Sequence, residues 1–192
     1  PANKSLVCCR NARGWEGEIE KKYLKPVIKS PKESKKIIID PTKLKYKIFI
    51  CNKSKTELKK AGDVKTLKYI EWGEKQRTPQ NKKWIDVPSV QGRKYWWSII
   101  AKSPGPILLQ MINNDRFAAF INKTNVHVDH NLFEYLIEDE NRLNTLQNYL
   151  NSYVFALIKE VNSRVNLGDG ATKTEGVKKN SRYYFFKKSV IR

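Results

Sequence analysis

Two cations stand directly beside three aromatic residues in the segment Arg93-Lys94-Tyr95-Trp96-Trp97. Cationic side chains neutralise phosphate groups, and aromatic rings either stack on nucleobases or pack in a hydrophobic core. Just upstream, Gln91 adds an amide of the kind that pairs with adenine edges, as arginine pairs with guanine edges. We therefore expect Gln91, Arg93, Lys94 and Trp96 to contact nucleic acid. The alternatives are that the polar residues are merely solvated at the surface and that Trp96 and Trp97 pack in the core.

Four more cations lie in a loop that the sequence predicts over residues 74–83, with Pro79 inside it. Cations in such a loop can hold the phosphate backbone, which gives affinity without reading the sequence of bases. We expect these backbone contacts to come from Lys75, Arg77, Lys82 and Lys83.

A glycine-rich cluster near the C-terminus offers a second way to approach phosphate. Gly168-Asp169-Gly170 leaves room for backbone amides to come close to an anion. The cluster matches neither a nucleotide-binding P-loop nor a dinucleotide fingerprint, so a plain turn after a helix is the alternative. The contacts expected from this cluster are Arg164, Asn166, Gly168, Gly170 and Lys173.

No constellation for catalysis or metal binding emerges from the remaining residues. His127 and His130 bracket Asp129, but the chain has only these two histidines and no third ligand is evident. The three cysteines lack the spacing of a disulfide framework or a zinc site, so they are expected to be reduced thiols. The acidic run 138–140 fits the start of a helix. We expect no catalytic residue, no metal and no cofactor in this chain.

Charge is the strongest signal in the composition. Lysine and arginine number 38 against 19 acidic residues, a formal net charge of +19 over 192 residues. Residues 1–100 hold 25 basic and 10 acidic side chains, whereas residues 101–192 hold 13 and 9. A field this strong and uneven attracts a polyanion, and nucleic acid is the default partner.

Length and composition limit the class of protein. With 40% hydrophobic residues the chain can build a core, as one domain with a basic strand-rich lobe over about 1–100 and a β-plus-helical lobe over about 101–192. No apolar run is long enough to span a membrane, and the N-terminus lacks a signal peptide. We expect a cytoplasmic, prokaryotic protein that binds no membrane. Because the sequence starts at Pro1 without Met, we expect either a fragment of a longer chain or a processed start.

The elements that must position these residues are mostly short strands. The first half predicts one helix over 16–25, ended by Pro26, and a helical turn within 53–60. A β-branched run predicts a strand over 37–39, and alternation of apolar residues with lysines predicts one over 44–50. Further strands are expected over 66–72 and 95–100. Residues 89–93 are expected to form a turn or loop.

The second half predicts strands over 107–112, 117–121 and 125–129, the last of them half-buried. Leucines and valines at three- and four-residue steps predict a helix over 138–163, which Asn151-Ser152 bends or splits. A loop over 166–176 and a last strand over 183–186 follow. The expected fold class is α+β, with a short-stranded, mostly antiparallel β core and a long helical segment.

Four segments also resemble a known family. They are Tyr23-Leu24-Lys25-Pro26-Val27-Ile28-Lys29; Tyr69-Ile70-Glu71-Trp72-Gly73-Glu74; Arg93–Trp97 with the later Ile107–Met111 and Arg116-Phe117; and Leu150-Asn151-Ser152 with Ser163–Lys173. Together they are similar to the target-recognition (TaqI-like C-terminal specificity) domain of adenine-specific DNA methyltransferases and fused restriction–modification enzymes. The fourth segment is the most specific, although Ser163 stands where glycine is usual.

The resemblance implies a division of labour between two domains. A separate catalytic domain, covalently linked or a partner, would bind S-adenosylmethionine and methylate adenine, while this chain would choose the sequence in double-stranded DNA. The chain itself has no Asn/Asp-Pro-Pro-Tyr/Phe motif and no glycine-rich methyl-donor motif. Binding of RNA or single strands by aromatic stacking, a nuclease and a basic protein-interaction module are the alternatives.

Overall fold

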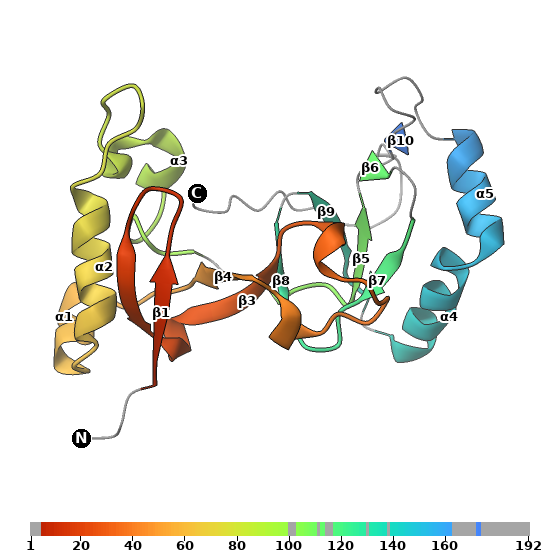
Figure 1. Cartoon of the computed structure of the whole chain (residues 1–192), viewed down its shortest axis with the longest axis horizontal. Coiled ribbons are helices and arrows are strands. Elements are labelled where there is room, and N and C mark those ends of the chain that lie inside the picture. The colour runs from red at the N-terminus through yellow and green to blue at the C-terminus, as the bar shows by residue number, and fades with distance from the viewer. Residues whose placement is uncertain are drawn as a thin grey trace. The chain divides into compact units, whose positions relative to one another are not determined.

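The computed structural model describes residues 5–99, 103–110, 112–113, 117–129, 131–137, 139–162 and 172–173. It has an α+β fold, as the sequence predicts, and divides into two compact units (Figure 1). Unit 1 comprises Pro1–Lys25, Ile48–Lys102 and Arg192, and unit 2 comprises Pro26–Lys47 and Ser103–Ile191. The chain passes from one unit to the other within strands β3 (Leu24–Ile28) and β4 (Tyr46–Phe49).

Unit 1 begins with an antiparallel hairpin. Strand β1 (Leu6–Arg10) pairs with β2 (Glu16–Glu20), so that Leu6 faces Glu20 and Arg10 faces Glu16. The connecting turn is stabilised by the Asn11 carboxamide oxygen, which accepts from the backbone N–H groups of Arg13 and Trp15. The prediction of a helix over 16–25 is therefore wrong, because pairing with β1 outweighs the local helical preference. A 3-10 turn, Lys21–Tyr23, leads into β3.

Three helices complete unit 1. They are α1 (Lys55–Lys60), α2 (Val64–Glu74) and α3 (Pro88–Gln91), with a 3-10 turn, Trp84–Asp86, before α3. Helix α1 confirms the helical turn expected there, and Ser54 and Glu57 form a capping box at its start. The loop expected over 74–83 is confirmed at Lys75–Lys83, after α2 ends at Glu74, and α3 forms where a turn was expected.

Two strand predictions in unit 1 are wrong. Residues 66–72 lie in α2, where Thr66, Leu67, Ile70 and Gly73 are buried at the three- and four-residue steps of one helix face. Residues 95–97 form turns instead of the strand predicted over 95–100. Both segments are rich in aromatic and branched residues, which favour strands locally but here fill a shared core. The buried members of that core are Ile19, Tyr23, Cys51, Leu58, Ile70 and Trp97.

Unit 2 is built on small sheets. One has the order β7 (Ala119–Ile121), β5 (Ile107–Gln110), β9 (Leu132–Tyr135), with both pairs antiparallel. In another, of order β4-β3-β8, strand β8 (His127–Val128) runs parallel to β3. Strand β6 (Ile112–Asn113) pairs with β10 (Thr172–Lys173). Two 3-10 turns, Pro31–Glu33 and Pro41–Lys43, precede β4.

The strand predictions for unit 2 fare better. Strand β5 confirms a buried strand within 107–112, and β7 confirms one within 117–121. Strand β8 is shorter than predicted, and the expectation that it is half-buried is wrong, because Val126 to Asp129 are all buried. In place of a strand over 37–39, the structure has a single bridge between Ile38 and Ile121. Strand β4 covers only 46–49 of the predicted 44–50.

The helical segment of unit 2 splits where the sequence predicts. Helix α4 (Glu140–Leu150) begins at Asp139, whose carboxylate accepts from two backbone N–H groups, and α5 (Tyr153–Asn162) follows after Asn151 and Ser152. The side chain of Asn151 accepts from the backbone N–H of Ala119 and donates to its carbonyl oxygen. The break therefore ties the helices to β7. The tail expected as a strand over 183–186 lies outside the described residues.

Candidate nucleic-acid interface

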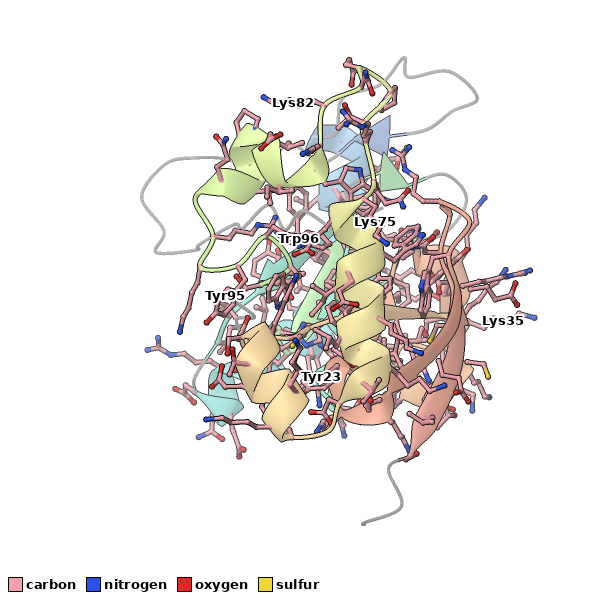
Figure 2. All side chains as sticks on the ribbon, turned by 90° about the vertical axis from the view of Figure 1, so that its left-hand side faces the viewer. Tyr23, Lys35, Lys75, Lys82, Tyr95 and Trp96 are labelled. Carbon is pink, nitrogen blue, oxygen red and sulfur yellow. The ribbon has the colours of Figure 1, made fainter. Side chains whose placement is uncertain are left out.

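The candidate interface is the segment 75–94 of unit 1, which we call the basic loop. It carries six basic residues and a single acidic residue, Asp86, a net charge of +5. It begins where α2 ends and finishes just before Tyr95. Figure 2 shows Lys75 beside the end of α2 and Lys82 near the outer end of the loop. The position of α2 therefore decides where these cations are presented.

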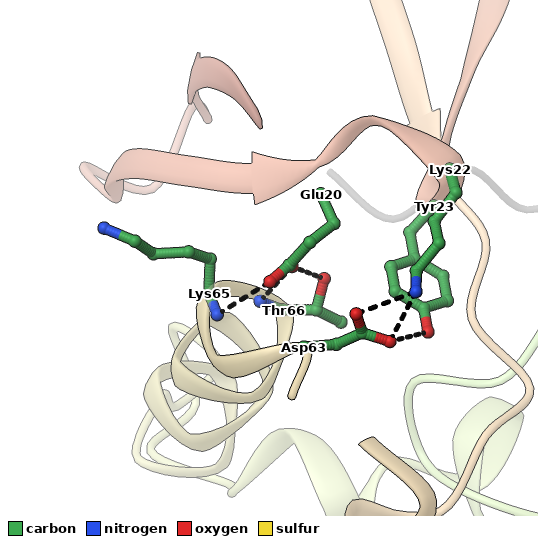
Figure 3. Close-up of polar contacts among 6 residues, drawn as sticks. All are labelled: Glu20, Lys22, Tyr23, Asp63, Lys65 and Thr66. Atoms are coloured by element: carbon green, nitrogen blue, oxygen red, sulfur yellow. Dashed lines mark hydrogen bonds and ion pairs between the residues drawn. The ribbon is translucent and has the colours of Figure 1, made fainter. Parts of the chain in front are cut away.

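Two buried carboxylates hold the start of α2 (Figure 3). Asp63, at the N-cap, does not cap the helix; its fully buried carboxylate accepts from the Tyr23 hydroxyl at 2.6 Å and from Lys22 Nζ at 2.7 Å. Glu20 takes over the cap from a distant strand, accepting from the backbone N–H groups of Lys65 and Thr66 at 3.1 and 2.7 Å. Glu20 thus satisfies N–H groups at the start of α2, and Tyr23 and Lys22 satisfy the buried charge of Asp63.

The environment of Tyr23 perturbs its titration. Burial in the core is the main cause that raises the pKa of the Tyr23 phenol, and the hydrogen bond to the Asp63 carboxylate raises it further. Both effects favour the neutral phenol, because a phenolate would be desolvated and would face a carboxylate. Tyr23 therefore acts as a permanent hydrogen-bond donor at neutral pH.

Seven aromatic rings, from the basic loop and the segments around it, contact one another in a continuous series. We call this series the aromatic ladder. Its steps run from Trp15 through Tyr69, Trp72, Trp84, Trp96 and Trp97 to Tyr95. Successive ring centroids lie 4.6–6.1 Å apart, the separation of favourable edge-to-face and stacked pairs. All five tryptophans of the chain belong to this ladder.

The two ends of the basic loop meet at Gly73 and Trp96. A Cβ atom added at Gly73 would overlap the indole ring of Trp96, so the glycine is what lets the ring lie against α2. Gly73 lies at the end of α2 and Trp96 follows the basic loop, so this contact joins the segments on either side of the loop. The contact closes the loop at its base.

The outer part of the loop is a hydrogen-bonded hairpin. The backbone N–H of Thr78 donates to Lys82 O at 2.8 Å, and Asn81 N donates to Thr78 O at 2.9 Å. Arg77 forms a bridge to Lys83, and its Nη1 donates to Asn81 O at 2.9 Å. Asn81 has a φ of +60°, a left-handed conformation that asparagine tolerates better than most residues. The cations are thus carried on a defined backbone.

The structure leaves most of the predicted contact residues of this loop open to solvent. Lys75, Arg77, Lys82, Lys83, Gln91 and Lys94 are exposed, and among the described residues the five cations of this set form no ion pair. Arg93 is partly buried, and its Nη1 donates to Ser98 O at 3.4 Å. Trp96 is half-buried in the ladder, while Trp97 is 6% exposed and donates to Lys53 O.

The glycine-rich cluster lies almost entirely outside the described residues. Arg164, Asn166, Gly168 and Gly170 lie outside the described residues, and Lys173 lies in β10 of unit 2. The neighbouring Leu150-Asn151-Ser152 segment has a structural explanation. Leu150 is buried, Asn151 bonds β7, and Ser152 accepts from Phe155 N at the start of α5.

A second cationic region, which sequence reasoning did not single out, lies in unit 2. Residues 26–47, which we call the lysine segment, carry seven lysines and two acidic residues, also a net charge of +5. Tyr46 is 40% exposed, with Lys29 Nζ 4.5 Å and Lys45 Nζ 5.6 Å from its ring centroid. The signal was the density of lysines around one tyrosine in the predicted strand 44–50.

Comparison with models of protein families, with curated proteins and with solved structures returned no match to this chain. Within the described ranges, no helix is both long and apolar enough to cross a membrane, and no group of three or more His, Cys, Asp or Glu side chains is arranged to hold a metal ion. The candidate interface therefore rests on its own geometry and charge.

Proposed function

We propose that this chain binds double-stranded DNA through the basic loop and selects a sequence in it. The observation that carries the proposal is a set of exposed cations on a hairpin, which form no ion pair within the described ranges and which the Gly73–Trp96 contact and the aromatic ladder support. Phosphate contacts from such cations supply affinity, and a fixed backbone lets a few side chains discriminate between bases.

The aromatic residues support duplex recognition over the single-strand alternative. Tyr95 and Trp97 stack on each other at 4.9 Å, and Trp96 packs edge-to-face between Trp84 and Trp97. Rings that contact one another in this way have few free faces for nucleobases. The ladder therefore supports the loop, and the loop offers cations and amides to the nucleic acid.

With the family resemblance, the proposal extends to a biological role. The chain would serve as the target-recognition part of an adenine-specific DNA methyltransferase or restriction–modification enzyme. A linked or partner domain would bind S-adenosylmethionine and carry the chemistry, and this chain would contribute no catalytic residue.

The test is selection of bound duplexes from a randomised library, followed by titration of the selected duplex at several salt concentrations. We expect a defined sequence to emerge and log K to fall by about 0.9 per phosphate contact for each unit of log salt. A variant with Lys75, Arg77, Lys82 and Lys83 changed to glutamine should lose affinity for every duplex. Equal affinity for selected and random duplexes, or preferential binding of unpaired strands, would contradict the proposal.

A further inference from the structure

We infer that the tip of the basic loop, residues 78–82, enters the major groove and that Gln80 reads an adenine edge there. This inference rests on the proposed function and adds a specificity-determining residue that the sequence analysis did not identify. It is argued from the backbone of the hairpin, from the side chains at its tip and from the chemistry of base edges.

The tip is held in a single conformation before any ligand binds. Three hydrogen bonds close it: Thr78 N to Lys82 O, Asn81 N to Thr78 O, and Lys82 N to Thr78 Oγ1 at 3.2 Å. The guanidinium of Arg77 adds a fourth, to Asn81 O. One step further in, Trp84 N donates to Gln76 O, which joins the hairpin to the aromatic ladder. A preorganised tip spends little entropy on docking.

Gln80 and Asn81 carry the two exposed carboxamides at the tip, and Gln80 has the longer side chain of the two. Pro79, Gln80, Asn81 and Lys82 are all exposed. In the part of the chain that the structure describes, the Gln80 carboxamide forms no hydrogen bond, whereas Arg77 is already committed to the Asn81 carbonyl. Arg93, by comparison, is partly buried against Ser98. The Gln80 amide therefore lies in the turn of the hairpin, with Arg77 before it and Lys82 and Lys83 after it in the chain.

This arrangement matches a duplex groove. The major groove admits a two-stranded ribbon, and a glutamine amide pairs bidentately with adenine N6 and N7. Arg77 precedes the tip, and Lys82 and Lys83 end it. Cations on both sides of the Gln80 amide can therefore contact the phosphates that lie on both sides of a base edge. The inference is that Gln80 supplies the base contact and the flanking cations supply the backbone contacts.

Two substitutions at Gln80 test the inference by repeating the duplex selection with the full chain. Gln80→Ala should remove the preference at one A·T pair, lowering discrimination there by roughly 5- to 150-fold, while other positions keep theirs. Gln80→Glu should shift the preferred base at that position towards cytosine, because a carboxylate accepts from cytosine N4. Lys82→Gln is the matched control at the same tip and should weaken all duplexes alike.

The outcomes separate this inference from the proposed function. A wild-type chain that selects no duplex would overturn the proposed function. A wild-type chain that selects a sequence, with both Gln80 variants selecting the same one, would overturn the reading by Gln80 alone. A uniform loss of affinity in Gln80→Ala would also overturn it, because Gln80 would then be a backbone contact. Thermal unfolding of each variant checks that this exposed substitution leaves the fold unchanged.

Discussion

The basic loop of unit 1 and the lysine segment of unit 2 carry the same net charge, +5, on segments of similar length. They differ in what lies beneath the charge. The basic loop packs on the aromatic ladder and is closed by Gly73 and Trp96, whereas the lysine segment presents the exposed Lys45, Tyr46 and Lys47 at the start of β4. Equal charge gives equal attraction for a polyanion, but only a supported hairpin can hold a base-reading side chain in register.

The acidic residues of the two regions show the same difference. Those of the lysine segment stabilise local turns: Glu33 accepts from Lys29 N and Ser30 N, and Asp40 accepts from Thr42. The hydrogen bond from the Thr42 side chain, and after it the one from the Thr42 backbone, hold the pKa of Asp40 below its usual range. In unit 1, Glu20 and Asp63 are buried and their hydrogen bonds join residues 40 and 46 apart in the sequence. The buried carboxylates of unit 1 therefore make long-range contacts that hold the start of α2, whereas the carboxylates of the lysine segment stabilise local turns and its long-range contacts come from its backbone and apolar side chains.

The largest effect on stability is expected from Asp63→Ala. It leaves the Tyr23 hydroxyl without its buried acceptor and a cavity where the carboxylate was, while the half-exposed Lys22 turns to solvent, so we expect a loss of about 2–4 kcal/mol in the free energy of unfolding. Asp40→Ala is the matched control in the lysine segment and should cost clearly less, because the Asp40 carboxylate bonds only Thr42 in a local turn. Urea unfolding measures both, and equal losses would contradict a tertiary role for Asp63.

Gly73→Ala should disrupt the closed base of the basic loop, so that the loop, like the lysine segment, keeps its charge but lacks that support. The added methyl group overlaps the Trp96 ring, so we expect about 1–3 kcal/mol of destabilisation together with lost sequence selectivity, while salt-dependent attraction remains. Gly92→Ala, within the same loop, has no atom within 4 Å of the added Cβ and should leave stability unchanged. Retained selectivity in Gly73→Ala, measured by competition between selected and random duplexes, would show that the closed base is dispensable.

The pH dependence of stability should distinguish the buried contacts of unit 1 from the exposed surface of the lysine segment. Because the folded state raises the pKa of Tyr23, the folded chain holds the phenol proton more tightly than the unfolded chain. This contribution is fully present below the unfolded value of about 10 and is lost as pH rises above it, by at most about 1.4 kcal/mol per pH unit. Urea unfolding from pH 8 to 11.5 should therefore show a steeper alkaline loss in the wild type than in Tyr23→Phe. Parallel curves would contradict this role of Tyr23.

The smallest effects on stability, below about 0.5 kcal/mol, are expected from neutralising exposed lysines. Changing Lys75, Lys82 and Lys83 to glutamine should reduce the salt slope of duplex binding by about 0.9 per lost phosphate contact. The same change at Lys29, Lys45 and Lys47 tests the lysine segment, and we expect a smaller reduction and an unchanged selected sequence. A larger reduction from the second set would move the main contact surface to unit 2.

The sequence predicted the fold best where local signals and tertiary contacts agree. The apolar run before Met111 forms a buried strand, and Asn151-Ser152 splits the helical segment, because in both places the local pattern agrees with the pairing to β7. It failed at 16–20 and 66–72. There, pairing with β1 and the buried acceptor Glu20 decide the structure, and both partners are distant in sequence.

For the candidate site, the sequence predicted the cations of the basic loop but not their support. Exposed lysines are recognisable from composition, whereas the contact between Gly73 and Trp96 joins residues 23 apart. Gln80 went unnoticed for the same reason, because the hydrogen bonds that place it at the tip involve the backbone of Thr78 and Lys82. Patterns of residue type do not contain such contacts.

The central claim is that the basic loop, and not charge spread over the whole chain, contacts the duplex. Lysine acetylation footprinting by mass spectrometry, with and without the selected duplex, tests it most directly. We predict that the duplex protects Lys75, Lys82, Lys83 and Lys94 from acetylation, while Lys59 and Lys60 on α1 stay reactive. Equal acetylation of the loop lysines in the free and bound chain would contradict the claim.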